Sequence, residues 1–208
     1  MLNKKTKVFS FIILLMFSLF TNAFSAEEQV TSLNLEKTPV TLQLRQLDLS
    51  EFMLIFSEKA NMEIKVEKEE GRKRISAFFY NVNIEDAIFS IIEYSGYDLL
   101  KENNNHYILS KADENILDKV KTLNKEDINY NQIINKKFSN TDILEVFVFF
   151  NDEAKMNFIV DTLIRNRQVN INFENISANE ALFQLLNQFN LKAFLYKNII
   201  GIFPNNKK

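Results

Sequence analysis

The sequence predicts an α+β fold of two tandem β-α-β-β-α-β-β domains, each with two helices packed on small mixed sheets. The main observation is an internal repeat: a shift of 94 positions places residues 42–110 on residues 136–204 without a gap. In both stretches, segments of alternating apolar and polar residues and segments with helical spacing follow one another in the same order. Because a unit of roughly 70 residues can bury its own core, we expect domains at 27–110 and 133–208, with a linker at 111–132.

Each unit is expected to contain two capped helices. Asp48 stands three residues before Glu51, which is the spacing of a capping box, and Asp142 and Glu145 repeat the pair. The same reasoning places the start of the second helix at Asn83 and Ser177, and places helix ends at Asn61, Gly96 and Asn190, residue types that tolerate positive φ.

The alternating segments indicate strands, which we describe for the first unit. A strand is expected at 39–44, and a weak alternation at Leu33 and Leu35 would add another strand within 27–38. Two hairpins are expected, one pairing 62–66 with 75–80 through a turn that contains Gly71, the other pairing 97–101 with 106–110 through residues 103–105. In the linker, Ile116, Val120 and Leu123 have the spacing of a short amphipathic helix, and a loosely attached linker is the alternative.

The N-terminus resembles a secretory signal. Three lysines precede an apolar run from Val8 to Phe20, and Ala23 and Ser25 are small residues at the positions that a signal peptidase reads. The run is shorter than the roughly 20 residues of a membrane-spanning helix, so we expect secretion, cleavage after residue 25 and no stable membrane span afterwards. A retained membrane anchor is the alternative. Loss of three lysines leaves 22 cations against 27 acidic residues, a balance that disfavours nucleic acid as a partner.

A family resemblance rests on motifs that cover nearly all of the first unit. The motifs in the first unit are Asp48-Leu49, Ala60-Asn61, Gly71 with Ile75, Asn81-Val82, Asp86-Ala87-Ile88 and Ser95-Gly96-Tyr97. With these motifs the first unit resembles the short N-terminal (STN) domain shared by bacterial secretins and TonB-dependent receptors. The second unit keeps several of the motifs but has Lys155 and Arg165 where turn residues are expected.

The resemblance implies a small module in the periplasm of a Gram-negative-type envelope, whose role is contact with other proteins. In secretins such modules dock inner-membrane components, and in receptors they meet an anti-sigma regulator. The chain ends at Lys208, directly after the second unit, so we expect neither a secretin pore domain nor a receptor barrel.

Catalytic and metal-binding chemistry has little support in the sequence. There is no cysteine, and the one histidine, His106, occupies an ordinary strand position. These residues cannot supply a thiol nucleophile, a Ser-His pair or a common zinc site. The recurrent carboxylates lie at helix starts, where capping explains them. A carboxylate-based hydrolase of cell-wall glycans is the enzymatic alternative, and a KH-type nucleic-acid domain is excluded because no Gly-x-x-Gly loop is present. We predict no catalytic residue, cofactor or metal.

Two groups of residues are candidates for partner contact. The first is basic: Arg72, Lys73 and Arg74 follow Gly71, and Arg165 with Arg167 lies in nearly the same turn of the second unit. Such a cluster could orient an acidic partner, although a solvated turn is the simpler interpretation. The second is Phe147, within the five-residue apolar run 146–150, which is too long to be hidden on one helix face, and the run 52–56 repeats this feature in the first unit. Part of each run is expected to be covered by the other domain or offered to a partner, although core packing is the simpler interpretation for most of these residues.

These observations together predict a non-enzymatic protein-interaction module. We expect an adaptor of a secretin-type envelope machine, such as a type IV pilus or a protein secretion system, whose partner is a secretin or an inner-membrane assembly component. The alternative is a periplasmic signalling protein that contacts a regulator of the TonB-receptor and anti-sigma type. A homo-oligomer is possible because related modules pack side by side.

Overall fold

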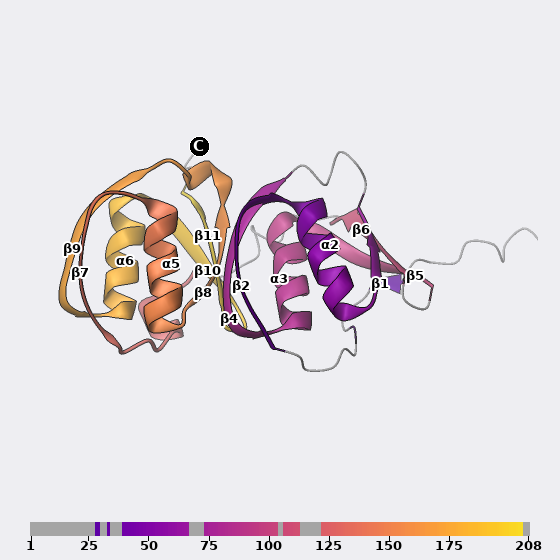
Figure 1. The fold of residues 1–208 in the computed structure, drawn as a ribbon, viewed down its shortest axis with the longest axis horizontal. Coiled ribbons are helices and arrows are strands. Elements are labelled where there is room, and N and C mark those ends of the chain that lie inside the picture. Colours follow the sequence, from indigo (N-terminus) through magenta and orange to yellow (C-terminus); the bar gives the residue numbers. More distant parts are fainter. Residues whose placement is uncertain are drawn as a thin grey trace, which may run out of the picture.

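The computed structural model describes residues 28–29, 33, 39–66, 73–103, 106–112 and 122–205, and it is a mixed α/β fold with helices between sheets. Five layers follow one another along the long axis (Figure 1): the β7–β9 pair, helices α5 and α6, a five-stranded sheet, helices α2 and α3, and a four-stranded sheet. We call residues 27–110 the first unit and residues 133–208 the second unit.

The elements of the two units correspond closely in length. In the first unit they are β1 (Glu28–Gln29), β2 (Pro39–Asp48), α2 (Leu49–Ala60), β3 (Glu63–Lys65), β4 (Arg74–Asn83), α3 (Ile84–Ser95), β5 (Tyr97–Asn103) and β6 (His106–Lys111). In the second they are β7 (Ile133–Asp142), α5 (Ile143–Ala154), β8 (Asn157–Asp161), the 3-10 turn η3 (Thr162–Ile164), β9 (Gln168–Ser177), α6 (Ala178–Gln188), β10 (Leu191–Tyr196) and β11 (Ile199–Pro204).

The five-stranded sheet contains strands of both units. Its order is β10-β11-β8-β4-β2, and β4 of the first unit pairs antiparallel with β8 of the second. Side chains of β4 therefore enter two cores: Ile75, Ala77 and Phe79 pack with the first unit, whereas Phe78 packs with the second. The helices on each side cover this sheet (Figure 1), so the two units share a buried layer.

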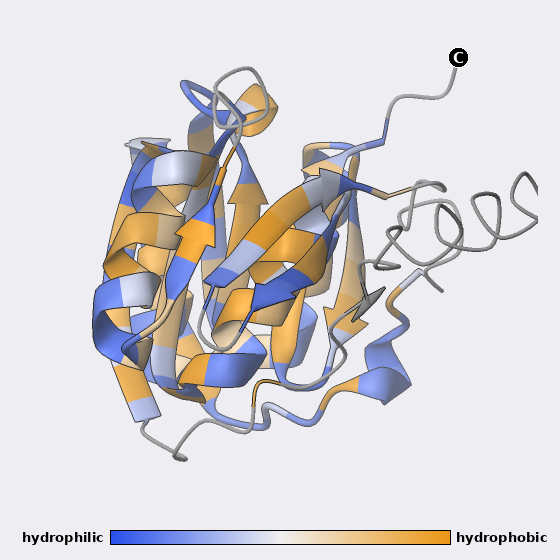
Figure 2. Ribbon diagram, turned by 90° about the vertical axis from the view of Figure 1, so that its right-hand side faces the viewer, coloured by the Kyte–Doolittle hydropathy of each residue, from blue (hydrophilic) through white to orange (hydrophobic). Residues whose placement is uncertain are grey.

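The hydrophobic residues follow this layering. Viewed from the side of the four-stranded sheet, hydrophobic colour runs along the helices and strands, and hydrophilic colour gathers at strand ends and turns (Figure 2). Several aromatic rings without exposed surface fill the two cores, including Phe52 and Phe56 in the first unit and Phe147, Phe150 and Phe158 in the second.

The predicted hairpin between residues 62–66 and 75–80 is wrong. Both segments are strands, but β3 pairs parallel with β6, and β4 pairs antiparallel with β2. The same holds in the second unit, where β8 pairs parallel with β11 and β9 pairs with β7. The two helices of a unit lie between two sheets, and the strands 62–66 and 75–80 belong to different sheets. In the first unit, the chain returns through α3 to the sheet of β3, where β6 is the parallel partner of β3.

The second predicted hairpin is confirmed, with one correction to the repeat. β5 and β6 pair antiparallel, as do β10 and β11, while residues 104–105 of the turn lie outside the described residues. Glu63 is opposite His106, whereas its counterpart Asn157 is opposite Ile199. The last strand is therefore shifted by one residue, and His106 corresponds to Ile199 rather than to the position that the ungapped alignment gives.

Most predicted helix ends are confirmed by the backbone. Asn61 and Gly96 are left-handed C-caps, and Lys155 takes the same role at the end of α5. Asn190 has positive φ, although α6 ends two residues earlier. Positive φ recurs at pairs of positions 94 apart: Gln46 and Asn140, Asn61 and Lys155, Asn81 and Asn175, Gly96 and Asn190.

The helix starts are confirmed with one difference between the units. Asp48 and Glu51 form the predicted capping box, in which the Asp48 amide donates to Glu51 at 2.8 Å. Asp142 caps α5 by accepting from the Leu144 amide at 2.8 Å. Glu145 does not follow the prediction, because its carboxylate binds Arg45 of the first unit.

Several predictions fall wholly or partly outside the described residues. The signal at 1–25, the turn at Gly71, Leu35, and linker positions 116 and 120 are not described. The strand added before β2 is β1, which pairs with β5, while Leu33 is buried outside any strand. Leu123 is buried and its amide donates to the Ala193 carbonyl at 2.7 Å. No helix among the described residues is long and apolar enough to cross a membrane.

Candidate interaction surfaces

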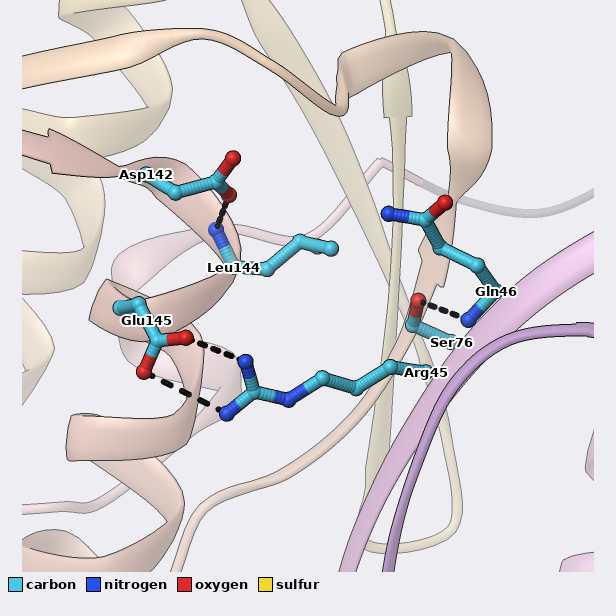
Figure 3. Close-up of polar contacts among 6 residues, drawn as sticks. All are labelled: Arg45, Gln46, Ser76, Asp142, Leu144 and Glu145. Atoms are coloured by element: carbon cyan, nitrogen blue, oxygen red, sulfur yellow. Dashed lines mark hydrogen bonds and ion pairs between the residues drawn. The ribbon is translucent and has the colours of Figure 1, made fainter.

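We call the contact between the two units the seam. It comprises the backbone pairing of β4 with β8 and polar contacts of β2 with α5. Arg45 of β2 reaches Glu145 of α5 (Figure 3), with Nη2 donating to Oε2 at 3.3 Å. Gln43, also on β2, donates to the carboxylate of Asp152 at 2.7 Å. These groups are largely exposed, so they orient the contact more than they stabilise it.

The opposite face of the shared sheet packs on α3 of the first unit. Tyr94 is 1% exposed, its hydroxyl donates to the Ile202 carbonyl at 2.9 Å, and its ring stacks on Phe194. Burial, with a smaller contribution from the negative charge of Asp161, raises the pKa of Tyr94 well above its ordinary value. Nearby, Lys197 of the second unit pairs with Asp86 at the start of α3. The two units therefore contact one another on both faces of the shared five-stranded sheet.

Two of the predicted contact residues instead stabilise helix ends. Lys73 donates from Nζ to the carbonyls of Tyr94 and Ser95, each at 3.1 Å, at the end of α3. Arg167, at the equivalent position, donates to the Phe189 carbonyl at the end of α6, at 2.8 Å. Burial lowers the pKa of Lys73, opposed by Asp161. Both cations neutralise the negative end of a helix dipole, and neither is a freely solvated turn residue.

The remaining predicted contact residues lie in different surroundings. Arg74 and Arg165 come together in a surface hollow of about 540 Å³ at the seam, where Arg74 also pairs with Asp48 at 2.8 Å. Phe147 has no exposed surface and packs on Phe158, so it is a core residue rather than a contact residue. Arg72 lies outside the described residues.

Sequence reasoning marked the apolar run 52–56 but missed the open groove beside β3 that Leu54 of this run lines, which we call the α2–β3 groove. It has a volume of about 700 Å³, and Leu54, 61% exposed, lies on its helical wall. Among the described residues, no strand pairs with the outer edge of β3. The groove is lined by Ser50, Leu54, Ser57, Glu58, Asn61, Met62, Glu63, Ile64, Val66 and His106.

The α2–β3 groove is the counterpart of the seam. Shifted by 94 positions, its apolar residues Leu54, Met62 and Ile64 become Val148, Met156 and Phe158, on α5 and β8 or next to them. In the second unit this surface is covered, because β4 lies along β8 and contacts α5. Each unit thus has an equivalent surface, and among the described residues only the surface of the second unit is covered by a strand.

A signal for the seam was present in the sequence. Residues 75–79 of β4 are all buried, and they read Ile-Ser-Ala-Phe-Phe, without the alternation of a strand that has one wet face. Such continuous runs of mostly apolar residues are typical of strands that are buried on both faces. The corresponding stretch of β9, Val169 to Phe173, does alternate.

Reactive groups do not gather at either surface. His106 Nδ1 lies 3.0 Å from the Glu63 carboxylate at the rim of the α2–β3 groove, and both side chains are exposed. Within the described ranges, no three His, Asp or Glu residues are placed to hold a metal ion. A search of protein-family models and of curated proteins finds no match to this chain.

Proposed function

We propose that the chain is a non-enzymatic protein-interaction module that works in the periplasm as an adaptor of a secretin-type envelope machine. The observation that carries the proposal is the α2–β3 groove, an open copy of a surface that binds polypeptide elsewhere in the same chain. Sheet edges with apolar side walls are common sites of peptide recognition, because backbone hydrogen bonds add to side-chain packing.

Sequence features support the cellular part of the proposal. The signal-like N-terminus favours export, and the first unit resembles domains that dock envelope proteins in secretins and TonB-dependent receptors. The recurrent carboxylates support a structural role: Asp48 and Asp142 act in helix caps, and Glu145 acts in an ion pair across the seam.

Crosslinking in living cells tests the proposal. Cells that express a tagged chain are crosslinked with formaldehyde and then fractionated, the chain is purified, and the attached proteins are identified by mass spectrometry. We expect the chain in the periplasmic fraction, attached to a secretin or an inner-membrane assembly component. A cytoplasmic location would overturn the proposal. So would hydrolysis of cell-wall glycans that a carboxylate substitution abolishes while the fold is retained.

A further inference from the structure

We propose that the α2–β3 groove binds an antiparallel β-strand of a partner protein, in the way that α5 and β8 bind β4. This inference rests on the proposed function, because it assumes that the chain binds proteins, and it adds the surface and the kind of segment bound. The template is internal: the seam shows the geometry of the complex in the second unit.

The helical walls of the two surfaces match in chemistry. Glu51, Leu54 and Glu58 are exposed on one side of α2, with the three- and four-residue spacing of neighbours on a helix. At the equivalent places on α5, Glu145 and Asp152 bind the side chains of β2 across the seam. The first unit therefore has the same two acidic residues around an apolar residue, with no described strand against them. Of the two, Glu58 lines the groove, whereas Glu51 accepts from the Asp48 amide in the capping box of α2.

The strand that forms the other wall also matches. Ile64 and Val66 are half-buried beside the groove, whereas their counterparts Phe158 and Val160 have no exposed surface under β4. The exposed surface of Ile64 and Val66 is the surface that a docked strand would remove from water. Because the edge of β3 is unpaired among the described residues, its free backbone groups can bond a new strand directly.

The occupant of the seam indicates what the partner segment must offer. β4 places Phe78 directly opposite Phe158, and the adjacent β2 supplies Arg45 and Gln43 to the carboxylates of α5. By analogy, the partner is a strand with a large apolar side chain opposite Ile64. Its neighbouring strand carries cationic or amide side chains that face α2.

A strand or hairpin fits better than a whole second domain. On the shared sheet, Ile159 is 1% exposed because the first unit covers that face. Its counterpart on the four-stranded sheet is Lys65, which is exposed, and the neighbouring Glu63 is exposed as well. The strand of the four-stranded sheet that borders the groove therefore carries charged side chains on its outer face, where the shared sheet has an apolar residue buried by the other unit.

A second copy of this chain is the less suitable occupant. The free edge that it would offer is β9, the counterpart of β4, which is unpaired on its outer side among the described residues. On β9, Asn170, Asn172 and Glu174 are exposed where β4 has Ser76, Phe78 and Tyr80. These polar side chains lack the apolar contact that β4 makes, so we assign the groove to a different protein.

The binding chemistry can be tested with a probe taken from the seam. A synthetic hairpin joins the sequences of residues 39–48 and 74–83 through an Asn-Gly turn, and fluorescence anisotropy measures its binding to the full chain. Leu54→Glu should weaken binding by about tenfold or more, because it places a charge against the apolar strand. Leu163→Glu is the matched control, since Leu163 is 68% exposed outside the groove, and it should leave binding unchanged.

The register gives a second readout. A hairpin with Lys in place of Gln43 should bind the native chain more tightly than one with Glu, and Glu58→Lys should reverse that order. Equal effects of Leu54→Glu and Leu163→Glu, or an order that Glu58→Lys does not reverse, would count against the groove.

A photocrosslink in cells separates this inference from the proposed function. A photoreactive phenylalanine analogue replaces Leu54 in one strain and Leu163 in another. Crosslinking of an envelope protein from position 54 alone, through a segment of alternating apolar residues, supports the groove. Crosslinking from position 163 alone keeps the adaptor and overturns the groove, and crosslinking of a second copy from position 54 overturns the choice of partner. An absence of crosslinks from both positions, together with failure of the formaldehyde capture, overturns both proposals.

Discussion

Phe78 and Phe158 stand directly opposite one another in the antiparallel pairing of β4 and β8, and neither has any exposed surface. Phe78 belongs to the first unit by sequence, yet it packs in the core of the second. The two units are therefore joined by apolar burial and by a shared sheet. This relationship predicts that damage at the seam will be felt by both units.

Phe78→Ala should destabilise the protein by about 3–5 kcal/mol, the usual cost of removing a buried aromatic side chain. Urea unfolding followed by tyrosine fluorescence and by far-ultraviolet circular dichroism measures the loss. Leu163→Ala serves as the control, because that side chain is 68% exposed and its removal should change stability by about 0.5 kcal/mol or less. An equally small effect of Phe78→Ala would mean that the seam is not packed as described.

Arg45→Ala should change stability far less, by about 1 kcal/mol at most, although it removes the ion pair that joins β2 to α5. The Arg45 and Glu145 side chains are 42% and 47% exposed, so water and salt screen their attraction. Thermal unfolding at low and at high salt measures this contribution. A loss as large as that of Phe78→Ala would contradict a seam held mainly by apolar packing.

The sequence predicted local structure better than it predicted pairing. Asp48, Asn61, Asn83 and Gly96 mark helix ends because caps depend on neighbouring residues. The partner of a strand depends on contacts far along the chain, so residues 62–66 and 75–80 were recognised as extended but paired wrongly. The α2–β3 groove was missed for the same reason.

Tyr94 should make stability fall with rising pH above about 10. Its pKa is raised in the folded protein, chiefly by burial, from an ordinary value of 10.0. As pH rises through 10, the unfolded chain loses the phenol proton while the folded chain keeps it. Ionisation therefore stabilises the unfolded state relative to the folded state. The contribution is complete below pH 10 and is lost between that pH and the raised pKa.

Tyr94→Phe tests this prediction. The variant should lose about 1 kcal/mol of stability at pH 8, because the hydroxyl no longer donates to the Ile202 carbonyl. Its stability should also decline less than that of the native chain between about pH 8 and about pH 10.5, a range that spans the ordinary pKa of tyrosine. Urea unfolding at both pH values measures the difference. Tyr80→Phe, which changes a ring that is 42% exposed, should keep the decline of the native chain. Identical declines in all three proteins would contradict the burial of Tyr94.

Gly201→Ala should destabilise the seam by about 1–3 kcal/mol through overpacking. A methyl group on Gly201 would overlap the Phe194 ring, which stacks on Tyr94 at a centroid distance of 5.9 Å. Combining Gly201→Ala with Phe194→Leu should cost less than the sum of the two single substitutions, because the smaller side chain leaves room for the methyl group. Strict additivity in urea unfolding would show that the two residues do not touch.

The charged candidates show why residue type alone does not identify a contact site. Lys73 and Arg167 were chosen from a basic cluster, yet both donate to carbonyls at helix ends. Their positions differ by the repeat distance of 94, and that recurrence was itself a sign of a structural role. Leu54 lies in the apolar run 52–56, for most of which core packing was the favoured interpretation. That Leu54 forms the wall of a groove depends on the open edge of the strand beside it, which the sequence did not reveal.

Asn172→Phe should convert the chain into a self-associating protein. The substitution gives β9 the aromatic residue that β4 uses at the seam, so β9 of one copy can dock on the α2–β3 groove of the next. In such a head-to-tail contact each added copy brings a further β9 edge and a further groove, so it should produce concentration-dependent oligomers in sedimentation velocity. Adding Leu54→Glu should restore the mass of the starting protein, whereas adding Leu163→Glu should not. Oligomers that persist with Leu54→Glu would show that the new aromatic residue binds elsewhere, and the equivalence of the groove and the seam would then fail.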